Sequence, residues 1–439
     1  MKVIKFGGTS CADASQLRKV QTIVEQDPRR EVVVVSAPGK RSDDDHKITD
    51  MLYLAHQLVS IDMGGGEVLD HISRRFLDIR NELGLSLDLE EDLSEIRQQI
   101  FSGASADFCA SRGEYLSAKV VAELLGFQFV DAAELIRFDD GGSLDMAETQ
   151  KQVRARLNGG RYVVPGFYGS TGSGRITTFS RGGSDITGAI LAGALGAEVY
   201  ENWTDVSGFL AADPHIVKSP VPIRVVTYEE LHELSYMGAQ VLHEDAVYPA
   251  RRAGVPIQIL NTNAPEAEGT RIVPSAELGD RIVTGIAGKT GFMVITIMKR
   301  HGGGDAGFLR RLTSVFEANS CAIEHMPSSM DTVSVIVRED QFRSRRKKIL
   351  EEIDIFSEPD SIRVSDNVAL LAVVGEGMAQ RPGVAARMFQ ALGQAGISIR
   401  MISQGASELN IIIGVGQDDF ERSVRVLYQE FFDEAKGEE

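Results

Sequence analysis

The stretch Phe179–Asp185, with the sequence FSRGGSD, joins two segments of different periodicity and decides the fold. Residues 176–179 form an extended run, and Ile186–Leu195 repeats apolar side chains at helical spacing. The predicted order is therefore a strand, a glycine turn and a helix. Two adjacent glycines let backbone N–H groups approach a ligand closely, and Ser184 or Asp185 is expected to cap the helix.

This turn has two interpretations. A helix N-terminus that follows a glycine turn favours anions, and Arg181 adds a planar fork of donors for a carboxylate or phosphate. The alternative is a tight strand-to-helix turn with an arginine on the surface. A second glycine turn in the same region favours the first interpretation.

That second turn lies near the N-terminus. Lys2–Phe6 is a predicted strand, Gly7–Ser10 (GGTS) is a turn, and residues 12–25 have helical periodicity. Glycine N–H groups, hydroxyl groups and the helix dipole together suit a phosphate, although no Gly-Lys-Ser/Thr follows as in a Walker A motif. Lys5 is placed to approach the same anion, and the alternative for it is an exposed strand lysine.

Further polar residues follow predicted strands, where ligands bind in open α/β sheets. Ser36 lies in the β-branched run 31–38, which is typical of a strand buried on both faces. Thr49 is expected to begin a helix, as its cap or as a ligand contact. Thr204 and Asp205 end a later strand, where the aspartate orients a magnesium nucleotide or its ribose, or only forms a turn.

Glu114 is expected just before a helix over residues 115–125, where the helix dipole favours a carboxylate. Its functional interpretation is a counter-charge for a ligand amine. Strands and helices alternate through residue 263, which predicts an α/β fold with a mostly parallel central sheet covered by helices. Residues 261–274 are rich in turn formers and are expected to close this domain.

The rest of the chain contains an internal repeat. Residues 307–326 match residues 383–402 at one constant offset. Each copy lies between strand-like runs and is followed by a final helix, in the βαββαβ order of a ferredoxin-like unit. Repeats of this kind without catalytic residues suggest ligand sensing or assembly.

Composition excludes several classes of protein. The 439 residues allow two or three domains, and 43% hydrophobic with 25% charged residues is typical of a globular protein. A net charge of -17 argues against a nucleic-acid partner. The sequence has no long apolar run, which predicts no membrane span. Its three cysteines, Cys11, Cys109 and Cys321, are far apart, which predicts no metal site at them and is typical of a cytoplasmic protein. Cys11 is interpreted as buried filler.

Together these segments resemble the aspartate kinases of the amino acid kinase superfamily, and the C-terminal units resemble ACT domains. The likeness covers nearly the whole chain, and its specificity lies in the ordered set rather than in any glycine pair. The matching segments are Lys5–Ser10, Val35–Ala37, Gly113–Glu114, Thr177–Thr178, Arg181–Asp185, Trp203–Val206, Gly238–Ala239 and Gln404–Asn410.

The resemblance implies transfer of the γ-phosphate of ATP to the β-carboxylate of L-aspartate, the first step of lysine, threonine and methionine biosynthesis. ATP would carry Mg²⁺ that bridges its phosphates, with no protein metal site assigned. The implied catalytic residues are Lys5, Gly7, Gly8 and Asp185. The implied substrate-binding residues are Ser36, Thr49, Glu114, Arg181 and Ser184. The implied nucleotide-binding residues are Thr9, Ser10, Thr204, Asp205, Phe209, Leu210, Gln240 and Val241.

The ACT-like units are implied to bind lysine and/or threonine as feedback effectors and to pair the chains as a homodimer or homotetramer. The implied domains are residues 1–275, 276–365 and 366–439. In the family the first ACT unit is inserted into the second, whose opening strand would be residues 282–286. The implied effector-binding residues are Gly307, Phe308, Leu309, Ala322, Ile323 and Glu324.

Three alternatives stay open at this point. One is a kinase for another acidic amino acid, such as a glutamate 5-kinase or acetylglutamate kinase. Another is a kinase-derived amino-acid sensor with impaired catalysis. The third, a dinucleotide-binding oxidoreductase, is disfavoured because the Gly7-Gly8 pair lacks a spaced third glycine.

Two positions depart from the family pattern. Leu210 stands where many members have tyrosine, and Gln240 stands where a lysine is expected to contact ATP phosphates. Because a neutral amide supplies no positive charge, Gln240→Lys is expected to lower the apparent KM for ATP in a steady-state assay of ADP release. An unchanged KM would mean that another cation, such as Lys218 or Arg224, already neutralises the phosphates.

Overall fold

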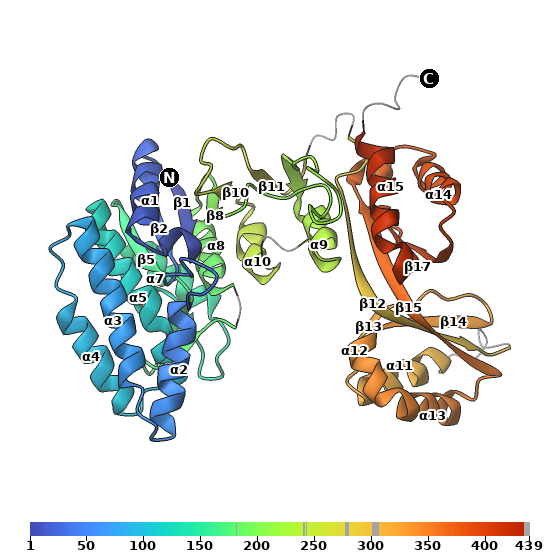
Figure 1. Cartoon of the computed structure of the whole chain (residues 1–439), viewed down its shortest axis with the longest axis horizontal. Helices are drawn as coiled ribbons and strands as arrows, with labels where there is room; N and C mark the ends of the chain where they lie inside the picture. The colour runs from blue at the N-terminus through green and yellow to red at the C-terminus, as the bar shows by residue number, and fades with distance from the viewer. Residues whose placement is uncertain (181, 240–241, 243, 277–280, 301–306, 434–439) are drawn as a thin grey trace. The chain divides into compact units, whose positions relative to one another are not determined.

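The computed structural model describes residues 1–180, 182–239, 242, 244–276, 281–300 and 307–433 (Figure 1). The chain divides into two compact units, each described below by itself. The first unit comprises Met1–Phe209, Pro222–Tyr228 and Gln240–Ala276, and the second comprises Leu210–Val221, Glu229–Ala239 and Glu277–Glu439.

An eight-stranded sheet forms the centre of the first unit, in the order β3-β5-β2-β1-β8-β10-β11-β9. β10 and β11 pair antiparallel and the other described neighbours pair parallel, which confirms the mostly parallel sheet. A small second sheet has the order β4-β6-β7. The strands are β1 Lys2–Phe6, β2 Arg30–Val35, β3 Gln128–Phe129, β4 Arg137–Phe138, β5 Tyr162–Pro165, β6 Tyr168–Thr171, β7 Ile176–Thr178, β8 Tyr200–Thr204, β9 Val225–Thr227, β10 Ile257–Asn261 and β11 Thr270–Val273.

Helices lie on both sides of this sheet (Figure 1). α8 packs against β1 and β8 and also against α7 and α10. A short 3-10 turn, Thr9–Cys11, follows β1. The helices of this unit are α1 Ala14–Gln26, α2 Ile48–Ser60, α3 Gly66–Leu83, α4 Glu90–Phe101, α5 Ala106–Leu125, α6 Ala132–Leu135, α7 Met146–Arg156, α8 Gly183–Leu195 and α10 Glu244–Ala253. The helix α9, Tyr228–Tyr236, begins at the last residue of a first-unit segment and otherwise belongs to the second unit.

The predicted start of α5 is wrong. The helix begins at Ala106, with the Ser105 hydroxyl accepting a hydrogen bond from the Phe108 N–H at 3.2 Å. Glu114 therefore lies in the middle of the helix, and the helix dipole does not stabilise its charge. Gly113 looks like a helix break in the sequence, but a Cβ there would stand 2.8 Å from the Ala37 Cβ, so the glycine serves close packing within the helix.

Two other helix starts also differ from the prediction. α8 is capped by Gly182 in the left-handed conformation (φ 57°) without a side-chain hydrogen bond, so neither Ser184 nor Asp185 caps it. Glycine adopts this conformation at no steric cost. α2 begins at Ile48, so Thr49 lies inside its first turn and is not its cap.

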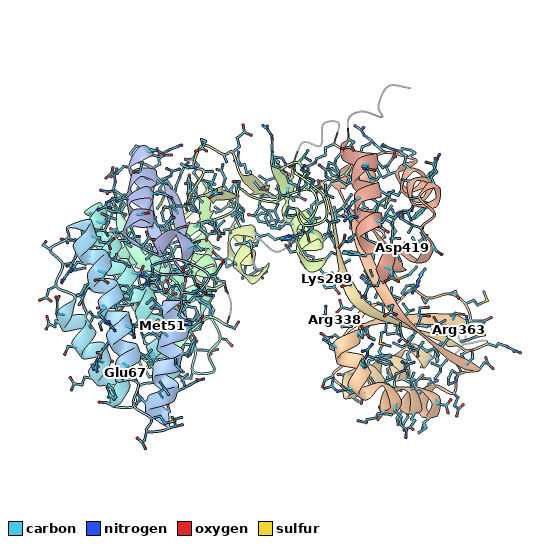
Figure 2. All side chains as sticks on the ribbon, in the orientation of Figure 1. Met51, Glu67, Lys289, Arg338, Arg363 and Asp419 are labelled. Carbon is cyan, nitrogen blue, oxygen red and sulfur yellow. The ribbon has the colours of Figure 1, made fainter. Side chains whose placement is uncertain are left out.

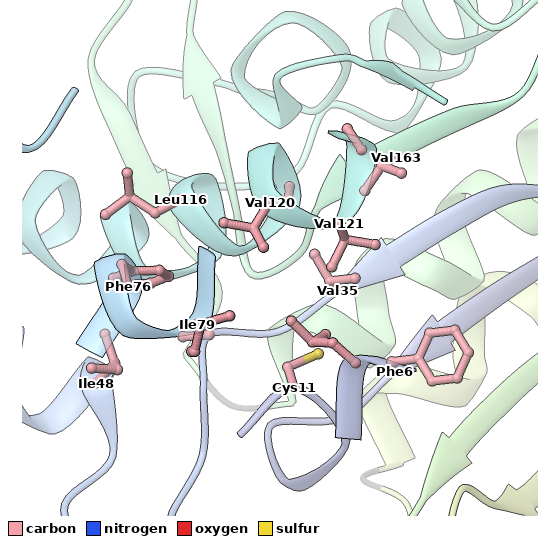
Figure 3. Close-up of a cluster of buried hydrophobic side chains, with 14 of the residues drawn as sticks. Phe6, Cys11, Val35, Ile48, Phe76, Ile79, Leu116, Val120, Val121 and Val163 are labelled. Carbon is pink, nitrogen blue, oxygen red and sulfur yellow. The ribbon is translucent and has the colours of Figure 1, made fainter. Parts of the chain in front are cut away.

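The hydrophobic core of the first unit lies directly under the turn that follows β1 (Figure 3). Phe6 and Val35 from the strands meet Val120 and Val121 from α5, and Cys11 from the turn lies among them. Cys11 is fully buried, which confirms it as filler, and burial raises the pKa of its thiol to about 12. The apolar packing around Cys11 therefore fixes the turn to the hydrophobic core.

The second unit contains a six-stranded sheet in the order β13-β14-β12-β15-β17-β16. Its two central strands, β12 Gly285–Met298 and β15 Ser361–Val374, pair antiparallel along 14 residues each. The other elements are α11 Phe308–Ala318, β13 Ile323–His325, β14 Thr332–Arg338, α12 Glu339–Phe342, α13 Arg346–Ser357, α14 Val384–Gln394, β16 Ile399–Gln404, β17 Asn410–Gly416 and α15 Phe420–Phe432.

The two ferredoxin-like units share this one sheet rather than forming a sheet each. Residues 292–298 of β12 pair with β14, whereas residues 285–289 pair with the half of β15 that also pairs with β17. The first ferredoxin-like unit is thus inserted into the second, in the order that the resemblance implied. The expected opening strand, residues 282–286, overlaps β12 only at its end. The domain bounds given above remain a prediction.

Among the described residues, no helix combines the length and apolar character needed to span a bilayer.

A buried carboxylate links the central strands of the first unit. Glu201 on β8 is 1% exposed, and its Oε1 accepts from Lys2 Nζ at 2.7 Å. Its Oε2 accepts from Arg30 Nε at 2.9 Å and from Trp203 Nε1 at 3.0 Å. One anion therefore pairs with two cations, one at the start of β1 and one at the start of β2, and Lys2 also pairs with Asp27 Oδ2 at 3.1 Å.

Glu201→Gln is expected to lower the free energy of unfolding of this unit by about 3 kcal/mol or more, because two partly buried cations lose their shared counter-charge. Trp203 is the single tryptophan of the chain, so its fluorescence during urea unfolding reports this unit. Glu198→Gln is the control, since Glu198 pairs with Arg29 where both side chains are more than half exposed, and a change below about 1 kcal/mol is expected. Equal losses in the two variants would contradict the argument.

Candidate active site

A buried ion pair lies at the carboxyl end of the central strand of the first unit. Lys5 on β1 is 7% exposed, and its Nζ lies 2.5 Å from Asp185 Oδ1 on α8. Asn202 on β8 joins them, since its Oδ1 lies 3.5 Å from Lys5 Nζ and its Nδ2 donates to Asp185 Oδ1 at 2.9 Å. Three elements thus hold one ammonium group in place.

Asn202 was missed in the sequence. It is the register partner of Lys5 in the parallel pairing of β1 with β8, so its proximity depends on which strands are neighbours. The available signal was a polar residue inside the strand run YENWT.

The glycine turn begins beside this ammonium group. A Cβ on Gly7 would stand 3.5 Å from Lys5 Nζ. The Gly7 N–H donates to the Trp203 carbonyl at 3.0 Å, so it is engaged within the structure rather than presented to a ligand. An anion at the turn would therefore meet the Lys5 ammonium and the backbone that follows Gly7.

The segment after β2 lies directly against this turn. The Gly39 N–H donates to the Gly8 carbonyl at 2.8 Å, and a Cβ on Gly39 would stand 2.6 Å from the Gly8 carbonyl carbon and 2.9 Å from the Thr9 nitrogen. Such distances are shorter than any real Cβ contact, so position 39 has no room for a side chain. Because of this contact, the segment that carries Ser36 lies beside the Gly7-Gly8 turn.

Glu114 presents a buried carboxyl group to the same region. It is 5% exposed and accepts a hydrogen bond from the Ala37 N–H, whereas its Oε2 has no partner in the described part of the chain. Burial raises the pKa of Glu114 to about 8. A buried carboxyl with one uncommitted oxygen is suited to accept a hydrogen bond from an ammonium group of a ligand. Ser36 directly precedes Ala37, and Thr49 lies in the first turn of α2, which follows the same loop. Both side chains are half-buried.

α8 begins at the same edge of the sheet. Ser184 is 8% exposed, and a Cβ on Gly166 would stand 2.5 Å from its Oγ, so the end of β5 and the start of α8 are in close contact. The Gly166 N–H in turn donates to the Val35 carbonyl at 2.9 Å. Arg181 lies outside the described residues.

The predicted nucleotide residues have different environments. Ser10 is buried and its hydroxyl lies 2.8 Å from the Thr262 hydroxyl, a partner that the sequence did not reveal. Asp205 is exposed and accepts from the Thr204 hydroxyl at 3.1 Å. Phe209 is 1% exposed, so its ring belongs to the core. Thr9 and Leu210 are exposed, and Gln240 and Val241 lie outside the described residues.

The predicted effector residues belong to the second unit. Gly307 precedes α11, Phe308 is buried and Leu309 is 44% exposed. On the strand side, the Ala322 N–H donates to Gln341 Oε1 at 2.9 Å, and Ile323 and Glu324 open the edge strand β13. Glu324 Oε2 accepts from the Tyr236 hydroxyl at 2.6 Å.

No group of three or more histidine, cysteine, aspartate or glutamate side chains is placed to bind a metal ion in the parts of the chain that the structure describes. Asp185 is the acidic group nearest to Lys5, and it is committed to that lysine.

The chain was compared with known proteins. Residues 1–261 match the amino acid kinase family, and residues 371–431 match an ACT domain. Aspartokinase 3 of Bacillus subtilis is 38% identical to this chain over 98% of the chain and 99% of its own length. The chain belongs to the amino acid kinase family, among its aspartokinases.

Solved structures agree with this assignment. Aspartate kinase of Clostridium acetobutylicum superimposes with a TM-score of 0.95 at 44% identity, covering 98% of this chain and 100% of that one. E. coli aspartokinase III, solved with aspartate and ADP, gives a TM-score of 0.73 at 26% identity over 98% and 100% of the two chains. The same protein with lysine and aspartate gives 0.76 at 27% identity over 98% and 99%.

The raised pKa of Glu114 predicts a dependence of stability on pH. The group binds its proton more tightly in the folded protein (pKa about 8) than in the unfolded chain, where 4.5 is usual. The folded state therefore holds the extra proton between these values, and this contribution to stability falls as pH rises through the window, by at most about 1.4 kcal/mol per pH unit.

Glu114→Gln removes this contribution. We expect the unfolding free energy of the wild type to fall relative to that of the variant between about pH 5 and pH 8, as measured by urea unfolding followed by Trp203 fluorescence. Glu123→Gln, an exposed position on the same helix, should run parallel to the wild type. Parallel curves for Glu114→Gln as well would contradict the raised pKa.

Proposed function

We propose that this aspartokinase transfers the γ-phosphate of ATP to the β-carboxylate of L-aspartate and forms 4-phospho-L-aspartate. The observation that carries the proposal is the 2.5 Å pair of Lys5 and Asp185 beside the Gly7-Gly8 turn. The E. coli relative bound to aspartate and ADP supports the choice of both substrates.

Phosphoryl transfer to aspartate requires charge neutralisation and positioning of the reactants rather than proton transfer. The β-carboxylate of aspartate is ionised near neutral pH and attacks without a general base. Lys5 neutralises charge on the oxygens of the transferring phosphoryl group, and Asp185 and Asn202 hold its ammonium in place. The turn at Gly7 and Gly8 provides the close backbone approach. Mg²⁺ would accompany the nucleotide and neutralise charge on its phosphates, and no residue of the chain is assigned to hold it.

The acceptor pocket is assigned to the residues around Glu114. Its uncommitted Oε2 binds the α-ammonium of aspartate, and Arg181 binds the α-carboxylate through its planar fork. Ser36, Thr49 and Ser184 complete the pocket. Because Glu114 is uncharged below its raised pKa, binding of the ammonium favours loss of the Glu114 proton.

The nucleotide is assigned to the neighbouring edge of the same unit. Thr9 and Ser10 follow Gly7 and Gly8. Thr204 ends β8, the strand next to β1, and Asp205 follows it. The remaining nucleotide-binding residues of this proposal in the first unit are Phe209, Gln240 and Val241.

Regulation is assigned to the second unit. Lysine and/or threonine would bind near the start of α11 and along β13, at Gly307, Phe308, Leu309, Ala322, Ile323 and Glu324. The E. coli relative solved with lysine supports an amino-acid effector. The proposal includes pairing of the ACT domains in a homodimer or homotetramer, a place in the cytoplasm, and a role at the start of lysine, threonine and methionine biosynthesis.

The test is ADP formation with MgATP and L-aspartate, with hydroxylamine to trap the acyl phosphate. Lys5→Met is expected to lower kcat by about 10²–10³-fold, because it removes a positioned cation from the transferring group. Lys19→Met on α1, an exposed lysine, should keep the wild-type kcat. Repeating the assay with lysine, with threonine and with both identifies the effector.

Two outcomes would overturn the proposal. Turnover with L-glutamate or N-acetylglutamate but not with L-aspartate would assign another acceptor. Binding of amino acids without turnover on any of them would favour the sensor, with Gln240 as the first residue to revert to lysine.

A further inference from the structure

Arg75 reaches from an outer helix into the two loops that form the candidate active site. It lies on α3 and is only 6% exposed. Its Nη2 donates to the Ala12 carbonyl at 3.1 Å and to the Gly39 carbonyl. Its Nη1 donates to the His46 carbonyl at 2.9 Å and lies 3.1 Å from Asp45 Oδ2. One guanidinium group therefore contacts four residues on two loops.

These two loops build opposite sides of the site. Ala12 ends the 3-10 turn that follows Gly8, and Gly39 is the residue whose backbone lies against Gly8. Arg75 donates hydrogen bonds to both residues, so it links the two loops a second time, beside the Gly8–Gly39 contact. The planar fork of arginine matches several carbonyls at fixed angles, which an ammonium group on a flexible stem does not.

The loop beyond Gly39 is also folded onto this guanidinium. Asp45 accepts from Arg41 Nε at 2.8 Å and pairs with Arg75, so the carboxylate has a cation on each side. Those partners hold the pKa of Asp45 well below its usual range. The segment between Gly39 and α2, which leads to Thr49, is thereby fixed at both of its ends.

We propose that Arg75 is a positioning residue for phosphoryl transfer. It touches neither substrate, and it holds the turn that follows β1 and the segment that follows β2 in register, so that the transferring phosphoryl group and the acceptor meet in line. The inference rests on the proposed function. Displacement of reacting groups by about 1 Å costs on the order of 10²-fold in rate.

The surroundings of Arg75 allow a direct chemical test. A cavity of about 610 Å³ is lined by Arg75 together with Met51, Val68 and His71, between α2 and α3. Figure 2 labels Met51 on α2 and Glu67 in the first turn of α3, the two helices concerned. A small guanidinium ion that enters this cavity can occupy the place of the Arg75 head group after truncation.

The experiment measures kcat for MgATP and L-aspartate in the full-length wild type and in Arg75→Ala, with and without methylguanidinium. Arg75→Ala is expected to lose about 10²-fold in kcat, and methylguanidinium is expected to restore at least a tenfold part of that loss. Arg75→Lys should remain slow, because it keeps the charge but not the fork. Arg74→Ala, an exposed arginine on the same helix that lines the same cavity, should keep the wild-type kcat with and without the ion.

Wild-type kcat in either Arg75 variant overturns the inference. So does a loss of kcat that methylguanidinium leaves unchanged while the thermal midpoint falls, because Arg75 would then only stabilise the fold. Absence of aspartate-dependent turnover in the wild type itself is a failure of the proposed function, and it is recognised before any variant is compared.

Discussion

The first unit depends on a backbone contact that tolerates no side chain. The loops that follow the adjacent parallel strands β1 and β2 meet at Gly8 and Gly39, where the Gly39 N–H donates to the Gly8 carbonyl. Parallel neighbours direct both loops to the same edge of the sheet, and the missing Cβ atoms let the loops touch there. Cys11 anchors this contact from the core side, and Arg75 holds it from the α3 side. The site is thus rigid because its two walls are fixed to each other.

Two carboxyl groups near this contact have different partners. Asp185 lies 2.5 Å from a lysine ammonium, whereas Glu114 accepts from backbone N–H groups and has one oxygen without a partner among the described residues. Burial raises the pKa of Glu114 to about 8, against the smaller opposing effects of these hydrogen bonds and of Arg112. Asp185 is therefore part of an ion pair with Lys5, whereas Glu114 has an oxygen that is available to a cationic group of a ligand. This division matches a site that must position its own lysine and also recognise an amine of the substrate.

Local sequence signals predicted the elements that carry the site but not all of their partners. A β-branched run located β2, extended runs before polar or glycine-rich segments located β1 and β8, and glycine pairs located the turns at Gly7 and Gly182, because these signals act over a few residues. Asn202 and Arg75 escaped because their roles depend on distant neighbours. Glu114 was assigned to a helix start because the helix was predicted over residues 115–125, whereas it begins at Ala106 and Gly113 makes room for Ala37. All of the site assignments stay predictions, and residues 181, 240 and 241 also lie outside the described residues.

The shared sheet of the second unit constrains how its two ferredoxin-like units can differ. β12 and β15 each serve both units, so neither unit can change its twist without affecting the common strands. The register of their pairing shifts between Lys289 and Val294, and both strands have left-handed residues there, Gly291 (φ 83°) and Asn367 (φ 56°). A bulge of this kind bends a strand and increases its local twist. The two halves of the sheet are therefore joined at one irregular level, where the pairing changes register while both strands stay continuous.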